Sequence, residues 1–139
     1  ASARKINLDE PGVAIHVIYY MSQAGHKAES EALTKKLIAK YPKSYVYYDR
    51  YAKMLLKDKR YDEALTQVEN ALKYKEGNEP QLNVVKTKIL VGLKKKEEAI
   101  SLVDQTLALI EPYPEKYKRT KSTLAGIKAD LQKPEEVKK

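Results

Sequence analysis

Hydrophobic residues recur every three or four positions along most of this 139-residue chain, and helix-breaking residues fall between the runs. Apolar side chains at this spacing line one face of an α-helix, whereas a half-buried β-strand would place them at every second position. One such segment is opened by Pro11 and closed by Gly25, and the next runs from Ala28 to a stop at Pro42. We therefore expect one helix in each segment, because proline suits a helix start and glycine or proline marks its end.

The same reasoning predicts five more helices. The third helix is expected over Ser44–Lys57 and the fourth over Arg60–Lys75. The fifth has Pro80 in its first turn, the sixth runs from Glu97 to a stop at Pro112, and the seventh runs from Pro114 to Gln132. Acidic pairs open the fourth and sixth segments, where the positive end of a helix dipole favours them. Five glycines and six prolines are too few for the turns of an all-β domain of this length. The pattern thus predicts an all-α protein of seven helices.

Two stretches of the chain are versions of one another. Residues 60–65 (RYDEAL) and 95–100 (KKEEAI) share their pattern at a spacing of 35 residues, and a fainter copy places Ala32 where the others have Ala64 and Ala99. A period of about 34 residues built from two helices is typical of a helical solenoid. We predict a single domain with repeats over about 13–43, 44–78 and 79–112, a closing helix over 114–132 and a mobile tail over 133–139.

Large and small side chains alternate along two adjacent helices, in the order Tyr48, Tyr51, Ala52, Leu55, Tyr61, Ala64, Val68, Ala71. This run resembles the tetratricopeptide repeat, over about residues 13–111 as three repeats plus a closing helix. The resemblance implies a right-handed α-solenoid of antiparallel helix pairs. The stretch 41–44 (YPKS) also resembles the inter-repeat turn of bacterial members that serve cell-envelope assembly. In the third repeat two registers stay open, with either Thr87 or Lys86 at the small position.

The first helix of each pair lines the concave surface of such a solenoid. The resemblance therefore implies a peptide-binding groove formed by Met21, Val46, Asp49, Arg50, Lys53, Leu56, Lys57, Val84, Lys88 and Val91. Lys53 and Lys88 fall one period apart and resemble the two cations by which some family members hold the terminal carboxylate of a peptide. The asparagines that accompany those cations are missing, because Asp49 and Arg50 occupy the neighbouring places.

Charge adds a preference for acidic partners. Lys and Arg number 27 against 19 Asp and Glu, a net charge of +8 that steers acidic partners toward the protein. Part of the surplus lies near the C-terminus, at Lys116, Arg119, Lys121 and Lys128. If these residues share one helix face, nucleic-acid or anionic-surface binding is an alternative function, although aromatic residues for base stacking are lacking beyond Tyr117.

Residues for catalysis or metal binding are sparse. Cysteine is absent, the only histidines are His16 and His26, and the glycines are scattered rather than gathered in a phosphate-binding loop. We expect His16 to pack or line the groove and His26 to end a helix. No catalytic residue, metal site or cofactor is predicted, and we expect a non-catalytic interaction adaptor.

Two features of the chain leave its context open. The longest uncharged apolar run, Val13–Met21, is too short to span a bilayer. The sequence begins Ala-Ser-Ala without methionine, as a processed mature protein or a fragment would. The chain could therefore be an accessory domain of a larger enzyme or chaperone of the cell envelope, and its compartment could be the cytoplasm or, if the N-terminus is processed, a bacterial periplasm.

Overall fold

The computed structural model describes residues 7–134, which form seven α-helices and no strand. These are α1 (Pro11–Gln23), α2 (Lys27–Lys40), α3 (Tyr45–Lys57), α4 (Tyr61–Lys73), α5 (Glu79–Gly92), α6 (Lys96–Ile110) and α7 (Lys118–Leu131). The last helix begins later than expected, because residues 114–117 make turns that carry Tyr117 into a buried cluster with Ile110 and Leu124. Most of the predicted mobile tail, residues 135–139, lies outside the described residues.

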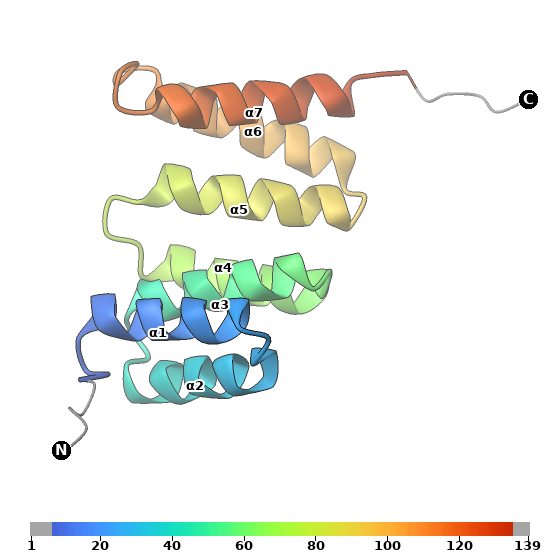
Figure 1. The fold of residues 1–139 in the computed structure, drawn as a ribbon. Coiled ribbons are helices and arrows are strands. Elements are labelled where there is room, and N and C mark those ends of the chain that lie inside the picture. Colours follow the sequence, from blue (N-terminus) through green and yellow to red (C-terminus); the bar gives the residue numbers. More distant parts are fainter. Residues whose placement is uncertain (1–6, 135–139) are drawn as a thin grey trace, which may run out of the picture.

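The helices pack as a stack of antiparallel hairpins, α1/α2, α3/α4 and α5/α6, with α7 against α5 and α6 (Figure 1). Equivalent helices start 34 residues apart between the first two hairpins (Pro11 and Tyr45, Lys27 and Tyr61) and 35 apart between α4 and α6 (Tyr61 and Lys96). The first helices of successive hairpins also touch, α1 with α3 and α3 with α5, and α5 touches α7. The all-α solenoid expected from the sequence is confirmed.

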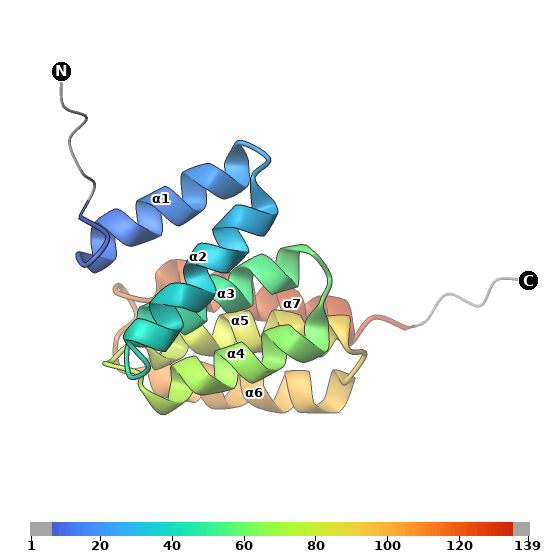
Figure 2. The same ribbon diagram turned by 90° about the horizontal axis from the view of Figure 1, so that it is seen from below.

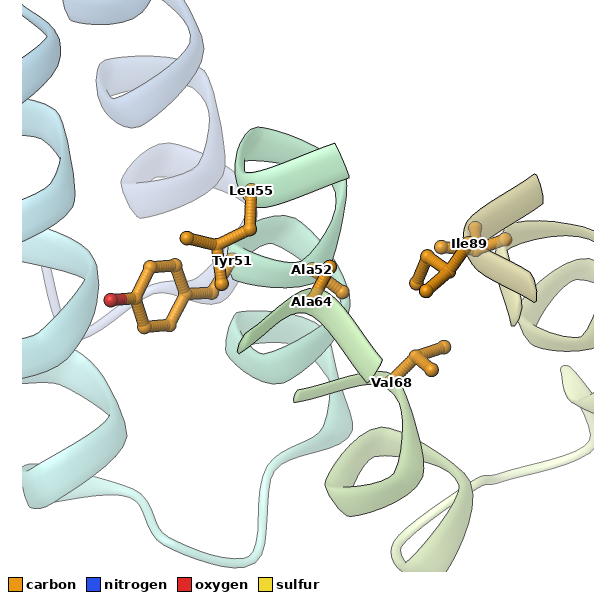
Figure 3. Close-up of a cluster of buried hydrophobic side chains, with 7 residues drawn as sticks. Tyr51, Ala52, Leu55, Ala64, Val68 and Ile89 are labelled. Carbon is orange, nitrogen blue, oxygen red and sulfur yellow. The ribbon is translucent and has the colours of Figure 1, made fainter. Parts of the chain in front are cut away.

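Small residues stand where the two helices of a hairpin come closest. Ala52 on α3 and Ala64 on α4 lie side by side and fully buried, while Val68 and Ile89 fill the space between α4 and α5 (Figure 3). In the third hairpin Thr87 and Ala99 are equally buried. Short side chains let the backbones approach, and the larger neighbours fill the remaining volume.

These positions also settle the register of the third repeat. Thr87 lies 35 residues after Ala52, at the equivalent small position, and its hydroxyl donates a hydrogen bond to the Asn83 carbonyl at 2.7 Å. Lys86 instead remains partly exposed and places its ammonium group 3.9 Å from the Glu69 carboxylate.

The first hairpin corrects one expectation. Ala32 is exposed, and the residue buried at the position of Ala64 is Ser30. Its hydroxyl donates to the Ile18 carbonyl at 2.9 Å, and the buried Thr34 hydroxyl donates to the Ser30 carbonyl at 2.8 Å. Because both hydroxyls have partners, these polar side chains can replace alanine and valine in the core.

The first hairpin also lies at a different angle from the others. Figure 2 shows α1 and α2 turned away from the direction that α3 to α7 share. At the places of the small residues Ala52 and Ala71, this hairpin carries the bulky and buried Ile18 and Leu37. Larger side chains at a crossing keep helices apart and change how their ridges fit, so the angle follows from the sequence.

The tyrosines of residues 41–51 tie the first hairpin to the second. Tyr47 is buried with Ala14, Ile18 and Leu37, and burial raises the pKa of its hydroxyl. The Tyr48 hydroxyl donates to the Pro42 carbonyl at 2.6 Å. This bond holds the turn before α3, whereas Ser44, at the N-cap position, makes no side-chain capping bond.

Helices α1, α3 and α5 end in the same way. Gly25, Lys59 and Lys94 each have a positive φ, of 88°, 61° and 61°. In each case the N–H of the following residue donates to a carbonyl five residues back at 2.9 Å, as from Arg60 to Leu55. This left-handed conformation favours glycine. The backbone is therefore strained at Lys59 and Lys94, whereas Gly25 adopts it in the first repeat without strain.

Replacing Ala64 with leucine should overpack the α3–α4 crossing and destabilise the protein by about 1–3 kcal/mol. Ala108→Leu, on the exposed side of α6, should have little effect. Thermal unfolding of the two variants measures the difference, and equal losses would contradict the crossing described.

Lys59→Gly and Lys94→Gly should each raise the free energy of unfolding by about 0.5–1 kcal/mol, because the relief of left-handed strain exceeds the added entropy of the unfolded chain. Lys36→Gly, at an exposed position inside α2, should lower it by about 1 kcal/mol. Urea unfolding curves give all three values. A loss of stability in the first two variants would refute this account of the helix ends.

Candidate functional site

A pocket of about 400 Å³ lies at the junction of the first and second hairpins. It is walled by the end of α1, the start of α2, the second half of α3 and the residue before α4. The lining residues are Ile18, Tyr19, Ser22, Gln23, Lys27, Ala28, Glu31, Arg50, Lys53, Met54, Lys57, Asp58 and Arg60. The pocket lies where the turned first hairpin meets α3 and the residue before α4.

Cations dominate the lining, with three lysines and two arginines against the carboxylates of Glu31 and Asp58. Three cations are held by acids. The Arg60 guanidinium binds both Glu31 and Glu63, which raises its pKa further; the Lys27 ammonium lies 3.3 Å from Asp58, and that of Lys53 lies 3.0 Å from Asp49. Within residues 7–134, the side chains of the other two, Arg50 and Lys57, have no carboxylate within 4.0 Å.

Arg50 is the most unusual of these groups. Its guanidinium carbon lies 5.9 Å from the centre of the Tyr19 ring, and its Nε atom is buried without a hydrogen-bond partner in the described part of the chain. Tyr19 in turn accepts a hydrogen bond from the Gln23 amide at 2.8 Å. A buried N–H without an acceptor costs about 1–3 kcal/mol, so Arg50 is a costly residue for the free fold.

The structure does not bring all the predicted groove residues together in one pocket. Arg50, Lys53 and Lys57 come together in this pocket, and Asp49 borders it through its ion pair with Lys53. Met21 and Val46 are half-buried on α1 and α3. Leu56 packs against the core of the second hairpin.

The predicted residues of α5 lie elsewhere. Lys88 and Val91 line a separate hollow of about 180 Å³ against Ile127 and Leu131 of α7. Val84 packs against the buried cluster that joins α6 to α7. Lys53 and Lys88 therefore stand in the walls of two different pockets, although they are one period apart.

Other lining residues were not expected from the sequence. Tyr19 and Gln23 come from the end of α1, Lys27 and Glu31 from α2, and Arg60 from the residue before α4. The prediction considered only the first helix of each pair, whereas the turned first hairpin also brings α2 into the wall.

The remaining candidate groups do not form a site for chemistry. His16 is exposed and stacks on Tyr20 at 6.3 Å between ring centres, so it neither packs in the core nor lines the pocket. Lys128 is paired with Asp104 at 2.7 Å. Residues 7–134 contain no cluster of three or more side chains suited to a metal ion, and none of their helices has the length and hydrophobicity of a membrane span.

Comparison with known proteins identifies the fold. No protein-family model matches the sequence, and no curated protein matches it. The structure is similar to the second TPR domain of the human RPAP3 protein, solved by NMR in complex with the HSP70 peptide SGPTIEEVD, with a TM-score of 0.70. The match covers 90% of this chain and 100% of that chain at 16% sequence identity.

The chain has a tetratricopeptide-repeat fold. Its three repeats are the three hairpins, and α7 is the closing helix. The pocket thus lies between the first and second tetratricopeptide repeats, with α1 and α3 as the first helices of their pairs.

Arg50→Met should change the free energy of unfolding by less than about 1 kcal/mol, because it removes a buried donor without a partner and keeps the aliphatic volume. Arg60→Met should be the more destabilising change, since it leaves Glu31 and Glu63 without their shared cation. Urea unfolding of both variants tests this, and a larger loss for Arg50→Met would mean that Arg50 serves the fold.

Proposed function

We propose that this tetratricopeptide-repeat domain is a non-catalytic interaction module that binds an acidic protein segment in the pocket between its first two repeats. The observation that carries the proposal is a pocket lined by five cations, two of which, Arg50 and Lys57, have no carboxylate within 4.0 Å among residues 7–134. The structurally similar RPAP3 domain binds a peptide, SGPTIEEVD, that contains three acidic residues. A net charge of +8 favours the same class of partner.

The residues of the pocket suggest how such a segment is held. A carboxylate of the ligand accepts hydrogen bonds from Arg50 and Lys57, the two lining cations without an internal acid. Tyr19 and Met54, which are not fully buried, provide apolar contacts for a neighbouring side chain of the ligand. Lys53 contributes less, since Asp49 already binds its ammonium group. Charge pairs would set orientation and association rate, and apolar contacts would set much of the affinity.

We propose that the bound carboxylates belong to side chains rather than to the end of a peptide. Lys88, the second cation of the expected terminal clamp, lines a different pocket from Lys53. The positions beside Lys53 carry Asp49 and Arg50 in place of the amides that such a clamp uses. An internal acidic stretch of a partner therefore fits as well as a C-terminus.

Charge reversal tests this function. A fluorescein-labelled peptide in which glutamates flank one isoleucine should bind the unmodified protein, and its C-terminal amide should bind equally well. Lys53→Glu combined with Lys57→Glu should weaken binding at least about tenfold in fluorescence anisotropy. Circular dichroism should show the same helix content, because both side chains are exposed.

Two single variants serve as controls. Lys36→Glu, at an exposed lysine of α2 outside the pocket, should bind like the unmodified protein, as should Lys88→Glu. If the double variant binds unchanged, or if the unmodified protein does not bind the peptide, the pocket is not the binding site proposed. If Lys88→Glu and the amide both lose affinity, the ligand's terminal carboxylate is held instead.

A further inference from the structure

The turn that joins α6 to α7 lies at the opposite end of the stack from α1 and α2 (Figure 1) and carries exposed apolar side chains. Tyr113 is 57% exposed and Leu109 42% exposed, and both belong to the small set of large hydrophobic side chains exposed among residues 7–134. We call this surface, with Tyr117, Lys116 and Lys121, the α6–α7 corner. Clustered exposed apolar side chains are typical of an interaction site, whereas single ones are ordinary.

Two pockets meet at the corner, and Tyr113 and Tyr117 line both. One, of about 380 Å³, is walled mainly by Leu107, Ile110 and Pro114. The other, of about 300 Å³, is walled by Pro80, Leu109 and Lys75 among others. The corner is therefore hollowed on a scale that accepts a large apolar side chain of a partner.

The backbone holds Tyr113 in its exposed position. Pro112 and Pro114 flank it and restrict the backbone, and its N–H donates to the Ile110 carbonyl at 2.9 Å. Its ring meets the ring of the buried Tyr117 edge to face, with 6.2 Å between centres. A fixed aromatic side chain loses little entropy on binding, so it is suited to anchor a partner.

Unpaired cations surround these pockets. The Lys116 ammonium lies 5.2 Å from the centre of the Tyr117 ring and 6.0 Å from that of Tyr113. Residues 116–121 (KYKRTK) carry four cations, and α7 has no acidic residue in its first turn. None of these four, nor Lys75, has a carboxylate within 4.0 Å in the described residues. The walls of the two pockets also include the carboxylates of Glu79 and Glu111, so their three lysines outnumber the acids by one.

We infer that the α6–α7 corner is a second docking site, which binds an acidic segment of a partner protein that carries a large apolar side chain. The apolar side chain enters the hollows beside Tyr113, and the acidic residues lie along Lys75, Lys116 and Lys121. A protein segment fits better than a nucleic acid, because a phosphate backbone makes no use of the mainly apolar pocket beside Leu107 and Ile110 or of the exposed Leu109. The site is separate from the pocket between the first two repeats and does not depend on it.

The test uses the full chain with Lys53→Glu and Lys57→Glu, so that the pocket between the first two repeats no longer binds an acidic probe. The probe is a short fluorescein-labelled peptide of aspartate and glutamate with a Leu-Phe pair at its centre, and anisotropy measures its binding. Adding Tyr113→Ala should weaken binding at least about tenfold. Tyr20→Ala, at an exposed tyrosine of α1, is the matched control and should leave binding unchanged.

The identity of the ligand is tested with two further probes. A peptide with the Leu-Phe pair replaced by Ser-Ser and a single-stranded oligothymidylate should both bind at least about tenfold more weakly than the Leu-Phe peptide. Equal binding of either probe, no binding of the Leu-Phe peptide, or no effect of Tyr113→Ala would overturn the proposal. Because the charges of Lys53 and Lys57 are already reversed in this protein, these results do not depend on the function proposed above for the pocket between the first two repeats.

Discussion

The close approach of paired helices at small buried residues is the constraint on which the rest of this structure depends. Ser30, Ala64 and Ala99 occupy equivalent places in the three hairpins, and each is fully buried. Short side chains there allow the helices of one hairpin to touch, and the larger residues around them lock the next hairpin in place. A constant step of 34 or 35 residues then repeats the arrangement and sets helix ends of different hairpins side by side.

The pocket arises from a departure within this regular stack. The bulky Ile18 and Leu37 stand where the second hairpin has alanines, the first hairpin is turned, and the end of α1 and the start of α2 line a hollow beside α3. Most cations around the hollow are paired with acids, which is a stable arrangement in the free protein. Arg50 is different, since part of its guanidinium is buried without an acceptor. Arg50 and Lys57 also have no carboxylate within 4.0 Å among residues 7–134, so their charge is available to a ligand.

Much of the fold could be predicted from the sequence, because helix periodicity, breakers and the repeat at Ala64 and Ala99 are all local signals. The register of the first repeat could not. Ser30 and Thr34 are polar, and only the folded chain shows that backbone carbonyls satisfy their hydroxyls. For the candidate site, the repeat pattern pointed to Arg50, Lys53 and Lys57. It could not point to Tyr19 or Lys27, because their place depends on the angle of the first hairpin, which side-chain volume sets and periodicity does not.

The central claim is that an acidic segment binds between the first two repeats. A titration of ¹⁵N-labelled protein with the glutamate-rich peptide, followed through its amide chemical shifts, tests this most directly. The account predicts that the largest shifts fall at the end of α1, the start of α2 and the second half of α3, among them those of Ser22, Lys27 and Lys57. Shifts centred on the outer faces of α4 and α6, with these amides unmoved, would contradict it.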